Sequence, residues 1–444
     1  MKEKIPIQTR TTGQNMIFNT AGSLVYFAAL WLLSVLIVRI SGFFDAGLLS
    51  LAMSATAAPA VVSLFNIRSF QVSDLVGEYQ DQEYIRSRHY TNALSFLVCV
   101  LIVLVYGYSG HKALIILAFM VFKAIEGLAD VYYGIEQKRE RMDYAGLSLA
   151  IRGVGGLLTF CVTFFLTKSL LFSILAMAVF SLAVILLYDK GKIKRWHLQD
   201  MDLHEINAKE PKSNKKMFSS LRTHVLFLQG SGRKAQNKKV FSLLHTCLPL
   251  MIVAFLNNLS ITLPRIFLEQ YHGEKVMGIF SSVSSPTLVI NMAAITLFAP
   301  LIPALTAEYN KGNKKAFLHG LRKFTLLITL MTVIAMIAAW FLATPALTLL
   351  FGKEIKPYVY LFLPIVLISV LMAVNGALFS ICTLTRAIKS QYVIGAWGIV
   401  AAFLTSLTLV KAYSMNGVTL AMVITVLIQI AIQLVIVGRK IRAI

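Results

Sequence analysis

Runs of about 20 mostly apolar residues dominate this chain, and short basic stretches separate them. A helix rises 1.5 Å per residue, so a run of this length crosses a hydrocarbon core roughly 30 Å thick. The composition agrees, because 57% of the 444 residues are hydrophobic and only 14% are charged. Soluble domains have about a quarter charged residues. The pattern therefore predicts an all-α polytopic membrane protein.

The apolar runs predict about 12 transmembrane helices. They are expected at 16–38, 44–66, 92–108, 113–135, 145–166, 169–188, 242–266, 276–302, 322–343, 357–382, 393–412 and 417–437. An even number of crossings places both termini on one side of the membrane. The residues before Asn15 are polar and lack the features of a secretory signal, so the first run is expected to be a retained helix.

The basic residues are distributed unevenly between the two sides of this topology. Segments on the side of the termini contain 32 Lys and Arg residues, and the opposite loops contain seven. By the positive-inside rule, both termini are cytoplasmic. The formal net charge of +22 therefore reflects topology and contact with anionic membrane lipids, and we expect no nucleic-acid partner.

One long polar stretch, 189–240, separates six predicted helices from six. We therefore expect an N-terminal lobe at 1–188, a cytoplasmic linker at 189–240 and a C-terminal lobe at 241–444. Within the linker, apolar residues between Met217 and Leu228 fall near one helical face. This segment is either an amphipathic helix on the membrane surface or a polar linker without regular structure.

The two halves contain a weak internal repeat. The sequence AGLLSLAMS at 46–54 corresponds to MGIFSSVSS at 277–285, and a Glu-Tyr pair follows each glycine after 31 or 30 residues. Each half has an even number of crossings, so the repeats share one orientation. They predict two six-helix lobes related by a pseudo-twofold axis along the membrane normal, with a cavity between them. Gly and Ser at this spacing also allow close helix packing.

One predicted helix has a stripe of ionisable residues. Lys123, Glu126 and Asp130 lie at i, i+3 and i+7, and Tyr133 and Gln137 continue the same face. A charge at the bilayer centre costs about 2.5–3.5 kcal/mol, so this face must meet protein or water. Three interpretations stay open: a structural ladder, a relay in which Glu126 and Asp130 load a proton or Na⁺, and contact between Lys123 and a substrate.

Further polar residues within the spans are candidates for substrate binding. Arg152 lies among small residues, where Glu126 or Asp130 could pair with it. Guanidinium groups bind pairs of phosphate oxygens, so several around one cavity favour an anionic head group. Arginines at helix ends can instead reach the membrane interface. The candidate substrate-binding residues are Arg39, Arg68, Lys123, Arg152, Asn257 and Arg265.

Motifs of common enzymes are missing from the sequence. There is no Walker A motif, GxSxG, HExxH or paired-cysteine metal site. The predicted outer loops are too short for a catalytic domain. We therefore expect no catalytic residue, cofactor or metal. Transport against a gradient would draw on an ion gradient or on trapping of the substrate.

Several segments resemble the bacterial polysaccharide flippases, which export O-antigen and capsule repeat units. This is the polysaccharide transporter branch of the multidrug/oligosaccharidyl-lipid/polysaccharide exporter superfamily. The resemblance is dispersed over the transmembrane region, is stronger in the first half, and includes a linker longer than is usual in the family. It is carried by 36–54, 67–74, 123–138, Met142 and Asp143, Arg152 and Gly153, Leu256 and Asn257, Pro264 and Arg265, 278–280 and Pro286.

The resemblance implies a substrate and a mechanism. The substrate would be an oligosaccharide on a polyprenyl diphosphate, moved from the cytoplasmic to the outer leaflet of the inner membrane. Alternating access of two lobes around a cationic cavity would move it, with coupling to H⁺ or Na⁺ as one option. We expect a monomer that can associate with polysaccharide assembly proteins.

Three other functions are compatible with parts of the pattern. A multidrug or toxin exporter would share the architecture, but such exporters favour acidic cavities, whereas this chain has at least as many buried cations as anions. A membrane-embedded polymerase or glycosyltransferase would alter its substrate chemically. A scaffold without transport activity does not explain charged residues within the spans.

Overall fold

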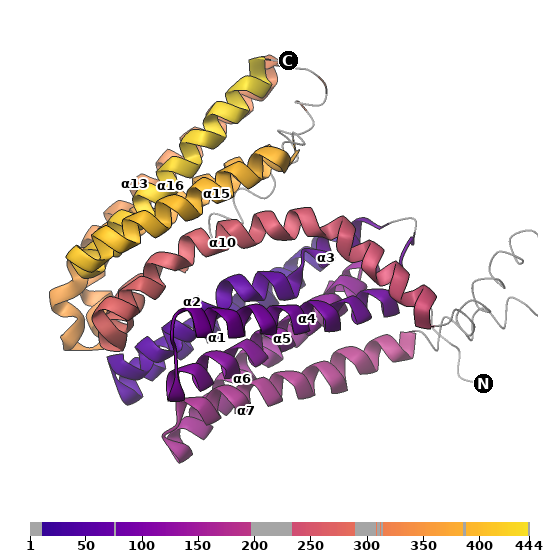
Figure 1. Ribbon diagram of the computed structural model, residues 1–444, viewed down its shortest axis with the longest axis horizontal. Coiled ribbons are helices and arrows are strands. Elements are labelled where there is room, and N and C mark those ends of the chain that lie inside the picture. The colour runs from indigo at the N-terminus through magenta and orange to yellow at the C-terminus, as the bar shows by residue number, and fades with distance from the viewer. Residues whose placement is uncertain are drawn as a thin grey trace, which may run out of the picture. The chain divides into compact units, whose positions relative to one another are not determined.

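The computed structural model describes residues 11–74, 77–196, 233–288, 308, 311, 314–384 and 388–442, and within these the chain is helical without a strand (Figure 1). The helices are α1 (Thr12–Ser41), α2 (Phe43–Leu64), α3 (Ile67–Ser73), α4 (Asp81–Val105), α5 (Gly110–Lys138), α6 (Met142–Thr167), α7 (Leu170–Val184), α10 (Arg233–Ser284), α13 (Lys314–Phe351), α14 (Phe362–Leu384), α15 (Ile388–Thr405) and α16 (Lys411–Arg442). Ile185–Asp189 and Ser406–Val410 are π-helical, and Lys353–Leu361 is a 3₁₀-helix.

Nine helical stretches among the described residues are long and apolar enough to cross a membrane. Two of them each contain a single non-helical residue, Gly273 in α10 and Ser414 in α16, which divides the stretch into two spans. Gly273 has φ 80°, a conformation that glycine adopts at little cost. α5 is a further long helix, with more charged residues. Every predicted transmembrane helix thus has at least a partial counterpart, and the all-α polytopic fold class is confirmed.

The predicted cytoplasmic segment 68–90 is wrong as a loop, because most of it is helical. α4 begins at Asp81, about three turns before the predicted start at 92. Acidic residues in the first turn suit the positive end of the helix dipole. The Glu83 carboxylate also accepts a hydrogen bond from the Gln80 backbone N–H at 2.8 Å, as in a capping box. Hydropathy alone misses this start, since local capping determines it.

The packing of the chain divides it into two compact units. Unit 1 comprises the described parts of Met1–Ala29, Val62–Val98 and Val121–Met251, and unit 2 those of Leu30–Val61, Cys99–Met120 and Ile252–Ile444. In unit 1, α6 packs along α7. In unit 2, α16 packs against α14 and α15, and α13 packs against α14. The candidate amphipathic helix between Met217 and Leu228 lies outside the described residues.

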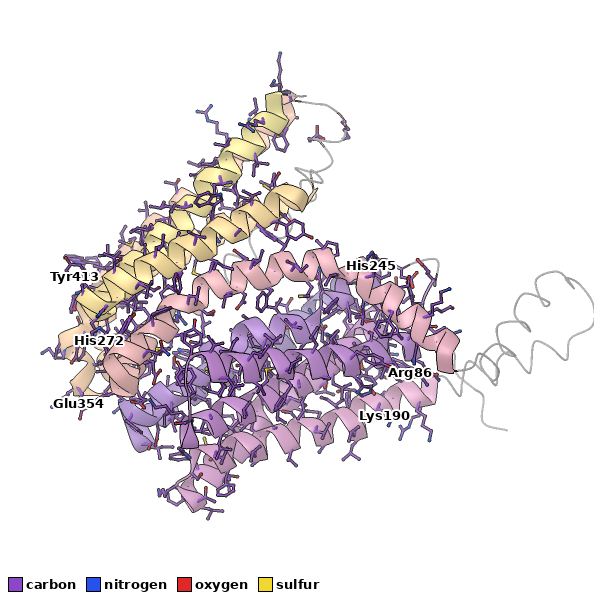
Figure 2. The ribbon with its side chains drawn as sticks, in the orientation of Figure 1. Arg86, Lys190, His245, His272, Glu354 and Tyr413 are labelled. Carbon is purple, nitrogen blue, oxygen red and sulfur yellow. The ribbon has the colours of Figure 1, made fainter. Side chains whose placement is uncertain are left out.

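Large apolar side chains at the surface and polar side chains in the interior are the distribution expected of a protein in lipid. Large apolar side chains such as Phe165, Leu187 and Trp340 are exposed, as lipid-facing residues are. Several polar side chains, including Arg88, are fully buried. In unit 1, Arg86, Lys190 and His245 lie near one end of the helices (Figure 2). The first two belong to the basic segments predicted to face the cytoplasm.

The two copies of the internal repeat contact each other within unit 2. A Cβ atom on Gly47 would overlap the carbonyl oxygen of Glu274, and one on Gly278 would overlap that of Phe43. Glu274 precedes Gly278 by four residues, and Phe43 precedes Gly47 by four, so the two contacts are equivalent. Reciprocal contacts of this kind are what a twofold relation between the copies predicts.

Candidate functional site

The polar stripe on α5 anchors a buried network in unit 1. The Glu126 carboxylate forms an ion pair with Arg152 of α6 and accepts a hydrogen bond from the Tyr26 hydroxyl of α1. Arg152 is only 3% exposed, and its Nη1 donates to the Tyr133 hydroxyl at 2.8 Å. Small residues allow this approach, since a Cβ on Gly153 would lie 2.8 Å from the Cα of Tyr26. Of the two predicted partners of Arg152, Glu126 is the one in contact.

Asp130, one turn further along α5, is paired with two arginines. Arg68 of α3 lies 3.4 Å from one carboxylate oxygen, and Arg88 of α4 lies 3.1 Å from the other. Arg68 also donates to the side-chain oxygen of Gln137 from Nη2 at 3.0 Å and from Nε at 3.3 Å. Arg88 is fully buried and also donates to the Ser63 carbonyl. Two cations thus share one carboxylate.

A cavity of about 360 Å³ opens beside this pair. Arg68 is 30% exposed, whereas Arg88 is enclosed, so Arg68 is the arginine that the cavity can reach. Three hydrogen bonds from Arg68 leave two of its five N–H donors for a ligand. The lining residues are Leu64, Asn66, Arg68, Ser69, Val72, Asp130 and Gln137.

A buried carboxylate holds the backbone of residues 77–79, which lie just before α4. Asp74 accepts backbone N–H groups of Glu78 at 2.9 Å and Tyr79 at 3.2 Å, and the Tyr84 hydroxyl at 3.0 Å. Burial alone would raise the pKa of Asp74. The hydrogen bonds and the Lys138 charge outweigh burial and lower that pKa below its ordinary value. The loop therefore loses stability only in acid, as pH falls through the lowered pKa.

Lys123 lies one turn before Glu126 on α5 and is half-buried. Its ammonium group is 5.5 Å from the centre of the Phe122 ring. The structure thus brings five predicted site residues into unit 1: Arg68, Lys123, Glu126, Asp130 and Arg152.

The other three predicted site residues lie in unit 2. Arg39 is exposed, and its Nε donates to the carbonyl of Leu350 at 2.8 Å, at the C-terminal end of α13. A cation at this end of a helix satisfies free carbonyl groups and the helix dipole. Arg39 thus contacts the end of α13, a contact that the sequence analysis did not predict.

Arg265 and Asn257 are half-buried residues of α10. Within the described part of the chain, the buried Nε of Arg265 has no hydrogen-bond partner. Its guanidinium carbon lies 5.9 Å from the centre of the Phe280 ring. Arg265 is therefore a cation that could still accept an anionic partner.

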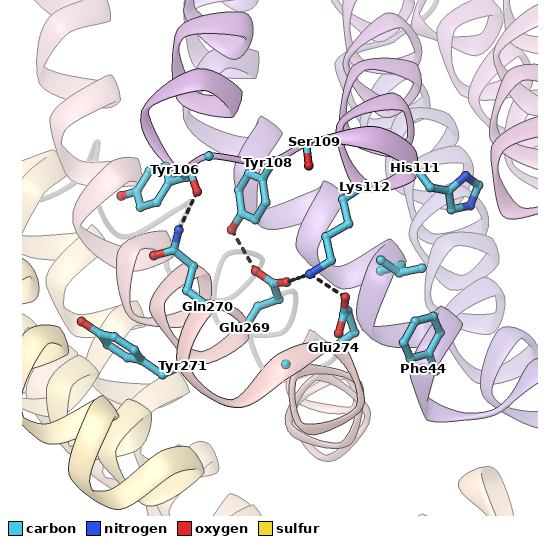
Figure 3. A pocket seen from close by; sticks show the side chains of 13 residues that line it. Phe44, Tyr106, Tyr108, Ser109, His111, Lys112, Glu269, Gln270, Tyr271 and Glu274 are labelled. Carbon is cyan, nitrogen blue, oxygen red and sulfur yellow. Dashed lines mark hydrogen bonds and ion pairs between the residues drawn. The ribbon is translucent and has the colours of Figure 1, made fainter.

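Unit 2 contains a second polar site that the sequence analysis did not identify. Figure 3 shows Lys112 between two carboxylates, with Nζ 2.8 Å from Glu269 and 2.6 Å from Glu274. The Tyr108 hydroxyl donates to Glu269 at 3.0 Å, and Glu269 is 2% exposed. A cavity of about 720 Å³ lies beside these residues. The ion pairs join the start of α5 to the turn at Gly273.

The similarity of the chain to known proteins is low in sequence and extends over nearly the whole fold. No protein-family model matches it. The capsular polysaccharide biosynthesis protein CapF of Staphylococcus aureus is 25% identical over 324 residues, which are 73% of each chain. A multidrug resistance MATE family transporter of the MOP superfamily, solved in an outward-facing conformation, matches 96% of this chain and 94% of its own with a TM-score of 0.58 and 13% identity.

Two further solved structures are similar over nearly the whole chain. The Vibrio cholerae MATE transporter VcmN has a TM-score of 0.59 at 11% identity, covering 97% of this chain and 96% of its own. The eukaryotic MATE transporter AtDTX14 has a TM-score of 0.58 at 14% identity, covering 97% of both chains. The chain has the MATE transporter fold. This agrees with the fold implied by the sequence resemblance.

Sequence reasoning missed Arg88, which holds Asp130 within this MATE fold. The prediction of a loop at 68–90 assigns Arg88 only to the positive charge of the cytoplasmic side. In the structure it belongs to the buried polar face of α4. A signal was available in the spacing of three to four residues among Glu83, Ser87, Arg88, Thr91 and Ser95, all of which are buried.

Asp189 was also missed, because it was placed at the start of the linker. The helix that contains it continues to Trp196. Asp189 ends the π-helical turn and is fully buried, and it accepts a hydrogen bond from the Ser148 hydroxyl at 2.9 Å. No local sequence pattern distinguishes this residue from an ordinary acid at the end of a span.

We expect Lys112→Met to destabilise the protein by roughly 2–3 kcal/mol, because two carboxylates would lose their shared cation. Breaking a fully buried ion pair costs about 3–5 kcal/mol, and Lys112 is 37% exposed, which reduces the loss. Thermal unfolding of the detergent-solubilised protein measures the effect. Lys275→Met, at an exposed lysine of the same turn, is the control and should change little. Equal losses in both variants would contradict the assignment.

Proposed function

We propose that the protein is a flippase that moves polyprenyl-diphosphate-linked oligosaccharides across the bacterial inner membrane by alternating access. Lobes at 1–188 and 241–444, joined by the linker 189–240, would alternate around the substrate, with coupling to H⁺ or Na⁺. Two comparisons support this proposal. The fold is that of transporters, and the name of the relative CapF refers to capsular polysaccharide biosynthesis.

The observation that carries the proposal is the excess of positive charge beside the cavity in unit 1. Arg68 and Arg88 share the single carboxylate of Asp130, and Arg68 retains free donors toward the cavity. A diphosphate provides the paired oxygens that a guanidinium fork binds well. Such a site favours an anionic head group over a cationic drug.

The remaining candidates have different surroundings. Lys123, Arg152, Asn257 and Arg265 remain proposed contacts for the diphosphate or the sugars. For Arg39, whose Nε donates a hydrogen bond to a carbonyl group of α13, we propose helix capping instead. For Glu126 and Asp130, which are paired with arginines, we propose a role in orienting those cations.

Multidrug export is the second candidate function, favoured by the description of a similar solved structure as a multidrug resistance transporter. A translocation assay in proteoliposomes separates the two functions. We expect transfer of a labelled polyprenyl-diphosphate oligosaccharide between leaflets without chemical change, and no uptake of hydrophobic cations. Transport of the cations alone would overturn the proposal, and an elongated product would indicate a polymerase.

We expect Arg68→Ala to lower translocation about 10- to 100-fold. The reason is the loss of charge-assisted hydrogen bonds, worth about 1.5–3 kcal/mol, to the diphosphate. Stability should change little, because Arg88 still neutralises Asp130. Arg68→Lys should retain part of the activity. Arg86→Ala is the control, since Arg86 bonds to Gln236 and does not line the cavity. Equal activity of Arg68→Ala and wild type would exclude this arginine as a substrate contact.

A further inference from the structure

Two fully buried carboxyl groups in unit 1 have no part in the function proposed above. They are Glu136, near the end of α5, and Asp189, in the π-helical turn after α7. Both carboxyl oxygens of Glu136 and one oxygen of Asp189 lack a hydrogen-bond partner in the described part of the chain. Short π-helical turns within α-helices are often found at functional sites.

These carboxyls differ from the acids of the polar stripe. Glu126 and Asp130 each form an ion pair with an arginine. Glu136 and Asp189 have no ion pair within the ranges that the structure describes. A buried carboxylate with no hydrogen-bond partner on either oxygen is strongly disfavoured, and among the described residues this is the state of Glu136, so Glu136 takes up a proton.

The surroundings of Glu136 strengthen this contrast. Its neighbours include two further acids, Asp189 and Asp143, whose negative charges oppose its ionisation. The two nearby cations are already engaged: Arg141 binds Asp143 at 2.9 and 3.0 Å, and Arg68 binds Asp130. The charged and titratable groups around Glu136 are Arg68 from α3, Tyr133 from α5, Arg141 from the turn before α6, Asp143 from α6, and Tyr188 and Asp189 from the π-helical turn.

A chain of hydrogen bonds connects Asp189 with the centre of the network. Arg152 donates to the Tyr133 hydroxyl at 2.8 Å, and Ser148 donates to Asp189 at 2.9 Å. Because the Ser148 hydroxyl donates its single proton to Asp189, Tyr133 must be the donor in the 3.1 Å hydrogen bond between the Tyr133 and Ser148 hydroxyls. Every donor in the chain points toward Asp189. The chain therefore links Asp189 to Arg152 and its partner Glu126.

We propose that Glu136 and Asp189 form a proton-binding site that serves as the coupling site of the transporter. This assignment rests on the proposed transport function and replaces Glu126 and Asp130 in the coupling role. One proton binds to a carboxylate oxygen of Glu136 and removes its repulsion with Asp189. Release of that proton restores the repulsion between Glu136 and Asp189, the residue that accepts the last hydrogen bond of the chain that begins at Arg152.

Infrared spectroscopy of the purified protein tests the site without a transport assay. We expect the C=O band of a protonated, slowly exchanging carboxyl group at neutral pH, absent in Glu136→Gln. Gln has nearly the shape of a protonated Glu, so this variant should fold. Asp130→Asn is the control and should retain the band. Absence of the band in wild type, or its persistence in Glu136→Gln, would overturn the proposal.

A second variant keeps the test decisive if Glu136→Gln does not fold. Asp189→Asn removes a neighbouring negative charge, so the band of Glu136 should disappear at a pH lower by about one unit or more. An unchanged midpoint would refute the coupling between the two acids. Both readouts are independent of any substrate. A failure of lipid-linked oligosaccharide transport would therefore overturn the proposed function. The proton-binding site would still be tested by the infrared spectra alone.

Discussion

Gly278→Ala is expected to separate two helices that the wild-type protein packs backbone to backbone. The added Cβ would overlap the carbonyl oxygen of Phe43, and a backbone atom cannot rotate away as a side chain can. Overpacking of this kind costs about 1–3 kcal/mol. Gly47→Ala should have the same effect, because its Cβ would overlap the Glu274 carbonyl in the equivalent contact.

Cross-linking measures the separation directly. The hydroxyls of Ser50 and Ser281 are hydrogen-bonded across the same contact. In a background without the native cysteines, Ser50→Cys combined with Ser281→Cys should form a disulfide readily. Addition of Gly278→Ala should slow this reaction and expose both thiols to a maleimide reagent.

Gly376→Ala provides the matched control. Gly376 lies in α14, and a Cβ there would meet no atom within 4 Å. Alanine favours a helix over glycine by about 0.5–1 kcal/mol, so this variant should be as stable as wild type or more stable. It should leave the cross-link unchanged. A Gly278→Ala protein that cross-links like the control would show that the helices do not pack as closely as described.

The sequence predicted the elements of this contact but not the contact itself. The matching Gly and Ser residues and their nearly equal spacing to a Glu-Tyr pair were readable in the printed sequence. Periodicity assigns residues to a helix face, but it does not say which helix that face meets. The same limit applies to Arg39, whose partner in α13 is 311 residues away in the chain.

The candidate site was predictable where polar residues interrupt an apolar helix. The ionisable stripe on α5 was recognisable in the sequence, because charged residues inside a membrane need partners. Glu126 was also one of the two partners expected for Arg152. Arg88 could not be found from hydropathy, since the start of α4 depends on a capping interaction between Gln80 and Glu83. The role proposed for Glu136 rests on the lack of hydrogen-bond partners among the residues that the structure describes, which no sequence pattern indicates.

Arg152→Ala is expected to have the largest effect of any substitution in the network. Arg152 is almost fully buried and connects Glu126 with Tyr133. Its removal leaves the half-buried Glu126 without its cation; breaking a fully buried pair costs about 3–5 kcal/mol, and the 19% exposure of the Glu126 side chain reduces the loss. Protein abundance and thermal stability should both fall. Arg195→Ala, at an exposed arginine of unit 1, should change neither.

A double variant then separates a structural role of Arg152 from a role in transport. Arg152→Ala with Glu126→Ala removes both charges of the pair, so most of the lost stability should return. If the guanidinium also contacts the diphosphate, translocation by the double variant stays at least tenfold below wild type despite normal abundance. Recovery of both stability and translocation would show that the pair is a structural ladder. The substrate contacts would then have to be sought at Arg68, which retains donors beside the cavity, and at Arg265, whose buried Nε has no hydrogen-bond partner in the described part of the chain.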